Sequence, residues 1–148
     1  MQINKKLPKF DARLMKVGLV VARFNSEITE KLLASALRAL KEYKVLDKNI
    51  AIVSVAGSME LPYALQKMVK IRHFNALIAL GCIIRGDTPH FDYVAKTAQE
   101  GALRVSLDHD IPIGFGVLTV NTPAQARKRL HVGGEATVAA LDLARLKI

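Results

Sequence analysis

Hydrophobic and polar positions along this 148-residue chain alternate between two patterns. Four nearly unbroken apolar runs occur, and each is followed by a segment whose apolar residues recur every three or four positions. A continuous apolar run is typical of a strand buried on both faces, and the second pattern indicates an amphipathic helix. The predicted strands are KVGLVVARF (16–24), NIAIVSVAG (49–57), ALIALGCII (76–84) and IPIGFGVLTV (111–120).

The segments after these runs carry helix-start signals. Asn25 or Ser26 can cap the first helix, and Glu27 and Glu30 suit its positive end. Its apolar stripe is predicted at Ile28, Leu32, Ala36, Leu40 and Tyr43. Further helices are predicted over LPYALQKMVKIRHF (61–74), from Thr88 to about His109, from TPAQARKRL (122–130), and over EATVAALDLARLKI (135–148), with Gly133 and Gly134 interrupting the last two.

Strands that alternate with helices predict an α/β fold, because crossover helices cover both faces of a parallel sheet. We therefore expect a three-layer α/β/α sandwich around a four-stranded parallel sheet, a flavodoxin-like arrangement. The length suits one domain, residues 1–148, that begins with an arm over 1–15. In such sheets ligands bind beyond the carboxyl ends of the strands, which here are RFNSE, AGSMELP, CIIRGDTPH and TVNTP.

Charge and composition narrow the classes of function. The net charge is +9, but the basic residues are scattered, tryptophan is absent and the few aromatics are not interleaved with basic residues. This argues against nucleic-acid binding and favours attraction of small anions. The single cysteine, Cys82, and the four histidines show no metal-ligand spacing. With no signal peptide and no long apolar run, we expect a cytoplasmic protein that contacts no membrane.

The stretch GCIIRGDTPHFDY (81–93) is the strongest candidate for chemistry. If Thr88 caps a helix that begins at Pro89, free backbone N–H groups and the helix dipole form an anion site, which Gly86 lets a ligand approach. His90 then lies in the first turn, where the dipole disfavours imidazolium and leaves a neutral ring that can accept a proton. The alternative is an ordinary helix start with a surface histidine.

Three other features allow both a binding and a structural interpretation. Ser58 and Glu60 in GSMELP can hold a polar ligand or cap the next helix. Phe24 and Phe115, at or near strand ends, can stack on a flat ligand or belong to the core. The basic run at 127–129 is either a solvated face or the source of an arginine that reaches a phosphate.

Taken together, RFN, GSMELP, GCIIRGDTPHFDYV and GFGVLT…QARKR…GGEA resemble the lumazine synthase family from about Lys16 to the end of the chain. The resemblance implies a role in riboflavin biosynthesis, the condensation of 5-amino-6-(D-ribitylamino)uracil with 3,4-dihydroxy-2-butanone 4-phosphate. The products would be 6,7-dimethyl-8-ribityllumazine, phosphate and water, formed without a cofactor or metal. It also implies a homo-oligomer, a pentamer or an icosahedral 60-mer, with active sites between subunits and an N-terminal arm that adds to a neighbour's sheet.

The same resemblance assigns roles to individual residues. His90 matches the proton-transfer residue, and Asp87 and Thr88 match the phosphate loop, joined by Arg129 from a neighbouring subunit. The other matches are Phe24 on the pyrimidine ring, Ser58, Met59 and Glu60 on the ribityl chain, Cys82, Ile83 and Ile84 on the pyrimidine edge, and Phe115 in the neighbour's pocket.

The chain departs from the family pattern at three places. Ala56 stands where a proline is usual, and Met59 where an aromatic is common. The connection after Arg129 is short and has Val132 where a second phosphate-binding lysine is expected. Two alternatives therefore stay open: a non-catalytic relative that binds lumazine or flavin, and a flavodoxin-like domain that binds an anionic nucleotide.

Overall fold

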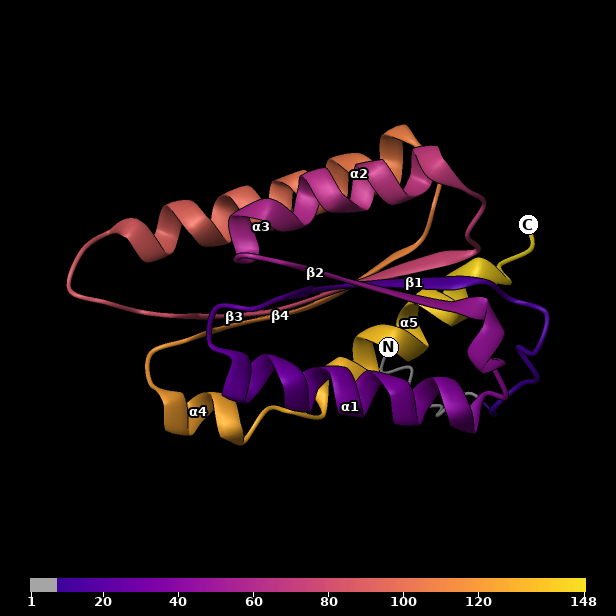
Figure 1. The fold of residues 1–148 in the computed structure, drawn as a ribbon, viewed down its shortest axis with the longest axis horizontal. Helices are drawn as coiled ribbons and strands as arrows, with labels where there is room; N and C mark the ends of the chain where they lie inside the picture. Colours follow the sequence, from indigo (N-terminus) through magenta and orange to yellow (C-terminus); the bar gives the residue numbers. More distant parts are fainter. Residues whose placement is uncertain (1–7) are drawn as a thin grey trace.

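The computed structural model describes residues 8–148, which form a three-layer α/β/α sandwich (Figure 1). The strands all run parallel, in the order β2-β1-β3-β4. Their bounds are β1 Val17–Ala22, β2 Ile50–Val55, β3 Ala76–Ile84 and β4 Ile113–Val120. The predicted α/β class and four-stranded parallel sheet are therefore confirmed, and β3 has the predicted bounds. Part of the predicted arm, residues 1–7, lies outside the described residues.

Helices cover both faces of the sheet. Figure 1 shows α1 (Ser26–Glu42), α4 (Pro123–Arg127) and α5 (Val132–Ala144) on one side and α2 (Leu61–Ile71) and α3 (His90–Asp108) on the other. Two short 3₁₀ helices, η1 (Asp47–Asn49) and η2 (Ser58–Glu60), flank β2. Each face has its own apolar core, one beneath α1 and α5 and one beneath α2 and α3. None of these helices is long and apolar enough to span a membrane.

The buried positions of β1 and α1 follow the predicted periodicities, whereas β2, an edge strand, has no buried residue, so the prediction that it is buried on both faces is wrong. Every residue of β1 is buried, as expected for a strand covered on both faces. The predicted stripe of α1 is also buried, and it consists of Ile28, Leu32, Ala36, Leu40 and Tyr43. The apolar pattern therefore predicted both the sheet and the face of α1 that packs on it.

The prediction that Gly133 and Gly134 separate two helices is wrong. α4 ends at Arg127, and both glycines lie in the first turn of α5. A Cβ atom at Gly133 would stand 2.2 Å from the carbonyl oxygen of Leu32, and the Gly134 N–H donates a 2.9 Å hydrogen bond to Ser35 Oγ. The glycines thus allow α5 to approach α1 closely, a requirement that outweighs their low helix propensity.

α2 is also shorter than predicted. It ends at Ile71 because Arg72 adopts an extended conformation, with φ −157° and ψ 167°. The segment 72–75 therefore forms the turn into β3 and does not continue the helix.

We expect Gly133→Ala to lower the free energy of unfolding by about 1–3 kcal/mol, because the added methyl group meets the backbone of α1. Urea denaturation followed by circular dichroism measures this change. Gly86→Ala is the control, since no atom lies within 4 Å of its added Cβ. Equal stability of the two variants would show that the helices can separate without cost.

Candidate active site

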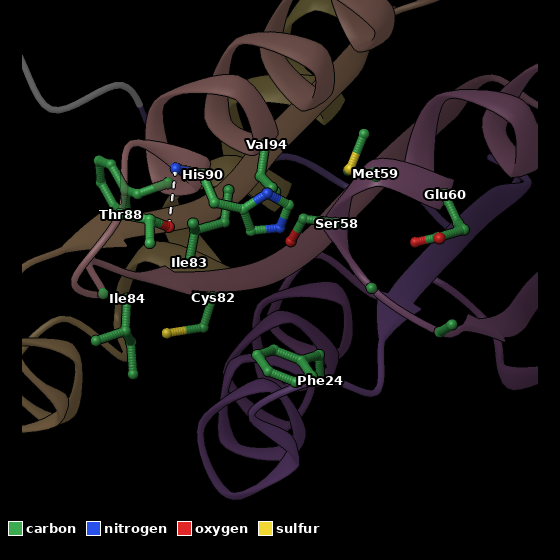
Figure 2. A pocket seen from close by; sticks show the side chains of 14 residues that line it. Phe24, Ser58, Met59, Glu60, Cys82, Ile83, Ile84, Thr88, His90 and Val94 are labelled. Atoms are coloured by element: carbon green, nitrogen blue, oxygen red, sulfur yellow. Dashed lines mark hydrogen bonds between the residues drawn. The ribbon is translucent and has the colours of Figure 1, made fainter.

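A pocket of about 480 Å³ lies at the carboxyl ends of β1, β2 and β3 and is closed on one side by the start of α3 (Figure 2). Nine of the side chains predicted from the sequence line it: Phe24, Ser58, Met59, Glu60, Cys82, Ile83, Ile84, Thr88 and His90. They come from loops far apart in the chain. The parallel sheet brings these loops together, as expected for ligand sites in folds of this kind.

The end of β1 carries the aromatic wall of the pocket. Phe24 is 72% exposed, so its ring belongs to the pocket and not to the core. Its N–H donates to the carbonyl oxygen of Ala56 at 2.9 Å. Asn25 then takes a left-handed conformation, φ 61°, and its Nδ2 donates to the carbonyl oxygen of Cys82 at 2.8 Å. This contact ties the end of β1 to the end of β3.

Ser58 and Glu60 follow β2 in the 3₁₀ helix η2. Neither η2 nor α2 has a hydrogen bond from a capping side chain, so the capping interpretation of Ser58 is wrong. Ser58 is buried, and Gly81 of β3 makes room for it, because a Cβ there would stand 2.6 Å from Ser58 Oγ. Glu60 lies over Gly57, whose own added Cβ would be 3.3 Å from Glu60 Oε2. Both side chains are thus available to a ligand.

The loop after β3 differs slightly from the prediction. α3 begins at His90 with Pro89 as its N-cap, one residue later than expected. The Thr88 hydroxyl accepts a long hydrogen bond, 3.4 Å, from the His90 N–H (Figure 2). Gly86 lines the pocket and leaves space around its Cα. The free backbone N–H groups and the dipole at the start of α3 attract anions, and the open space at Gly86 lets an anion approach them.

Arg85, at the start of this loop, contacts residues of neighbouring segments and not the pocket. Its Nε donates to Asn121 Oδ1 at 3.1 Å, and its guanidinium lies 4.5 Å from the ring centre of Phe91. An ion pair of 3.8 Å joins it to Asp92. Arg85 therefore links β4 and α3 to the loop and does not line the pocket.

Three predicted site residues lie outside the pocket of their own chain. Asp87 is exposed in the loop between Gly86 and Thr88. Phe115 is 37% exposed on the edge strand β4, and Arg129 is exposed in the turn after α4, where its Nη1 donates to the carbonyl oxygen of Gln125 at 2.8 Å. Of the basic run, Arg127 pairs with Glu27 at 3.1 Å and lowers the pKa of that carboxyl.

Phe91 and Val94 also line the pocket, although neither was predicted from the sequence as a site residue. Both belong to the start of α3, and Val94 lies four positions after His90, one helical turn away. The 3.6-residue period of a helix could have identified Val94. Phe91 gave no such signal, because adjacent residues on a helix point in different directions.

The pocket combines apolar walls with few ionisable groups. Glu60 and His90 are the ionisable side chains on its two sides, and burial raises the pKa of the Cys82 thiol to about 11. Cys82 therefore stays protonated near neutral pH and is a poor nucleophile there. Among residues 8–148, no three side chains of histidine, cysteine, aspartate or glutamate are grouped as metal ligands. The arrangement suits a flat, polar ligand and a proton transfer by His90.

Comparison with known proteins agrees with this geometry. Residues 14–147 match the family model described as 6,7-dimethyl-8-ribityllumazine synthase. A curated relative from Kosmotoga olearia, named 6,7-dimethyl-8-ribityllumazine synthase, is 41% identical, and the match covers 90% of this chain and 88% of the relative. The chain therefore belongs to the 6,7-dimethyl-8-ribityllumazine synthase family.

Proposed function

We propose that this chain condenses 5-amino-6-(D-ribitylamino)uracil with 3,4-dihydroxy-2-butanone 4-phosphate to form 6,7-dimethyl-8-ribityllumazine in riboflavin biosynthesis. Membership of the family supports the activity. The observation that carries the proposal is the single pocket that gathers an exposed aromatic ring, a serine and a carboxylate, a strand end and a histidine at a helix start.

The pyrimidine would bind between the ring of Phe24 and the end of β3. An exposed phenylalanine offers a face for offset stacking, and the Cys82–Ile84 strand end offers backbone groups and apolar surface. The hydrogen bond from Asn25 to the Cys82 carbonyl holds these two walls at a fixed separation. The ribityl chain would then extend towards Ser58, Met59 and Glu60, which can hydrogen-bond its hydroxyl groups.

The phosphate of the second substrate would bind at the loop formed by Gly86, Asp87 and Thr88. Backbone N–H groups at the start of α3 and the helix dipole favour a dianion there. Arg129 of a neighbouring subunit would add a charge-assisted contact. Val132, which packs against the core at the start of α5, supplies no second cation.

His90 would move protons between the two substrates. Schiff-base formation, elimination of phosphate and ring closure each need a proton donor or acceptor, and an imidazole can serve as both near neutral pH. Holding both substrates in one pocket supplies much of the remaining acceleration, since orientation can lower a barrier by up to about 10 kcal/mol. Cys82 takes no part as a nucleophile, because its thiol stays protonated.

We also propose that the chain is one lumazine-synthase-like domain over residues 1–148, assembles as a homopentamer and works in the cytoplasm. Two exposed apolar surfaces support assembly. One is the outer face of α3, with Tyr93, Leu103 and Leu107 each more than half exposed, and the other is the edge strand β2, with Ile52 and Val53. The buried free thiol of Cys82 suits a reducing compartment.

The activity is tested by mixing the purified protein with both substrates and following lumazine fluorescence and phosphate release against an enzyme-free control. Matching yields of the two products, formed faster than in the control, support the synthase. Lumazine binding without acceleration would instead identify a binding protein.

Replacing His90 with alanine should lower turnover by about 10²–10⁴-fold, the usual contribution of a general acid–base group. Product affinity, measured by fluorescence titration, should change little, because the ring moves protons and contributes little to binding. His109→Ala is the matched control, since His109 caps the other end of the same helix. Unchanged turnover in His90→Ala would remove this residue from the mechanism.

For Arg129→Ala, we expect the half-saturating concentration of the butanone phosphate to rise by about 10- to 100-fold, as loss of a hydrogen bond to a charged group implies. The half-saturating concentration of the pyrimidine substrate should stay nearly constant. Lys128→Ala removes an adjacent exposed charge and serves as control. Steady-state kinetics with each substrate varied in turn gives both values, and equal effects on the two substrates would contradict a phosphate role.

Light scattering of the purified protein should give a particle mass at least five times the chain mass of 16.2 kDa. The apolar surfaces on α3 and β2 would then be buried between subunits. A mass near that of one chain at working concentration would contradict the assembly.

A further inference from the structure

Another pocket, of about 210 Å³, lies at the end of the sheet where the strands begin. Lys16 precedes β1, Lys48 lies in η1 just before β2, and Arg72 and His73 precede β3. Because the strands are parallel, these three segments meet at the same end of the sheet, opposite the carboxyl ends that form the candidate active site (Figure 1). Four basic residues, all solvent-exposed, therefore line one small hollow.

Hydrogen bonds hold the segments of this basic pocket together. The Lys16 N–H donates to Asn75 Oδ1 at 2.8 Å, and the Asn75 N–H donates to the Lys16 carbonyl oxygen at 2.8 Å. Asn49, which also lines the pocket, donates from Nδ2 to the carbonyl oxygen of Arg13 at 3.1 Å. The backbones that carry the cations are thus fixed relative to one another before any ligand binds.

The positive charges of the pocket have no counter-charge among the described residues. No acidic side chain lines it, and none of its four basic residues takes part in an ion pair there. The Arg72 guanidinium lies 5.1 Å from the ring centre of Phe74, a cation–π contact that limits its freedom. Like charges gathered without a counter-charge repel one another, so an anion between them lowers the electrostatic energy.

A structural role at the end of α2 accounts for only part of this cluster. Arg72 and His73 follow the C-terminus of α2, where cations interact favourably with the helix dipole. Lys16 and Lys48 come from different segments and do not extend that helix. The helix dipole of α2 therefore does not explain why Lys16 and Lys48 line the same pocket.

We propose that this basic pocket binds a small, multiply charged phosphate compound, a phosphomonoester or a diphosphate. The planar guanidinium of Arg72 can form two parallel hydrogen bonds to phosphate oxygens, and Lys16 and Lys48 add point charges. The volume admits a phosphate group or two. The pocket takes no part in the proposed condensation, so this binding is a separate property of the chain.

Isothermal titration calorimetry with pyrophosphate tests the proposal on the assembled protein. The background variant is Arg129→Ala, which weakens the phosphate subsite proposed for catalysis. We expect one pyrophosphate per chain in the basic pocket. The added pair Lys16→Gln and Arg72→Gln should weaken this binding by at least about 10-fold, because each removes a charge-assisted contact. Higher sodium chloride should weaken it as well.

The control is the pair Lys31→Gln and Lys67→Gln, which removes the same charge from exposed positions on α1 and α2. This pair should leave the affinity nearly unchanged. An equal loss of pyrophosphate affinity in both pairs would show diffuse attraction to a basic protein and would overturn the proposal. The absence of saturable pyrophosphate binding would also overturn it. With Arg129 intact, Lys16→Gln and Arg72→Gln should still form lumazine, so a failure of the synthase assay and a failure here are distinguishable.

Discussion

The parallel pairing of β1 with β3 is the constraint on which the rest of the structure depends. Both strands are covered on two faces, and their register runs from Val17 beside Ala76 to Val21 beside Leu80. This pairing places Phe24 and the Cys82–Ile84 segment at the carboxyl end of the sheet, and Lys16 and His73 at the amino end. Together with the pairing of β1 with β2, which adds the segments before and after β2, this pairing accounts for both pockets. The hydrogen bond from Asn25 to the Cys82 carbonyl joins β1 and β3 at the end of the sheet that carries the candidate active site.

Much of this arrangement could be predicted from local sequence, because the decisive signals were local. Unbroken apolar runs identified the strands, and their carboxyl ends then identified most of the pocket, including Phe24, Ser58 and His90. The conformation of Gly133 could not be predicted in this way. It depends on the backbone of Leu32, about a hundred positions earlier, which α5 approaches too closely for any side chain. Local propensity favours a break there, and tertiary packing reverses it.

The basic pocket was missed for a related reason. Its basic residues, at positions 16, 48, 72 and 73, are spread over three segments and look scattered along the chain. Only the fold gathers them, whereas a dense basic block would have been visible in the sequence. The net charge of +9 favoured attraction of small anions but indicated no position for an anion site. The segments of the candidate active site could be predicted because each follows the carboxyl end of a predicted strand and carries its own local motif, whereas single basic residues before the strands carry no such signal.

The close contact between α5 and α1 also bears on the proposed phosphate contact. Because Gly133 and Gly134 hold α5 against α1, only residues 128–131 connect α4 to α5. Within this turn the Arg129 N–H donates to the Ala126 carbonyl at 2.9 Å, and the Arg129 carbonyl accepts from the Val132 N–H at 3.1 Å. The backbone of Arg129 is therefore fixed, and in the proposed role only its side chain, which donates to the Gln125 carbonyl, would have to reorient. If Arg129 holds the phosphate as proposed, this short, ordered connection would offset part of the affinity that the lysine expected at position 132 would have added.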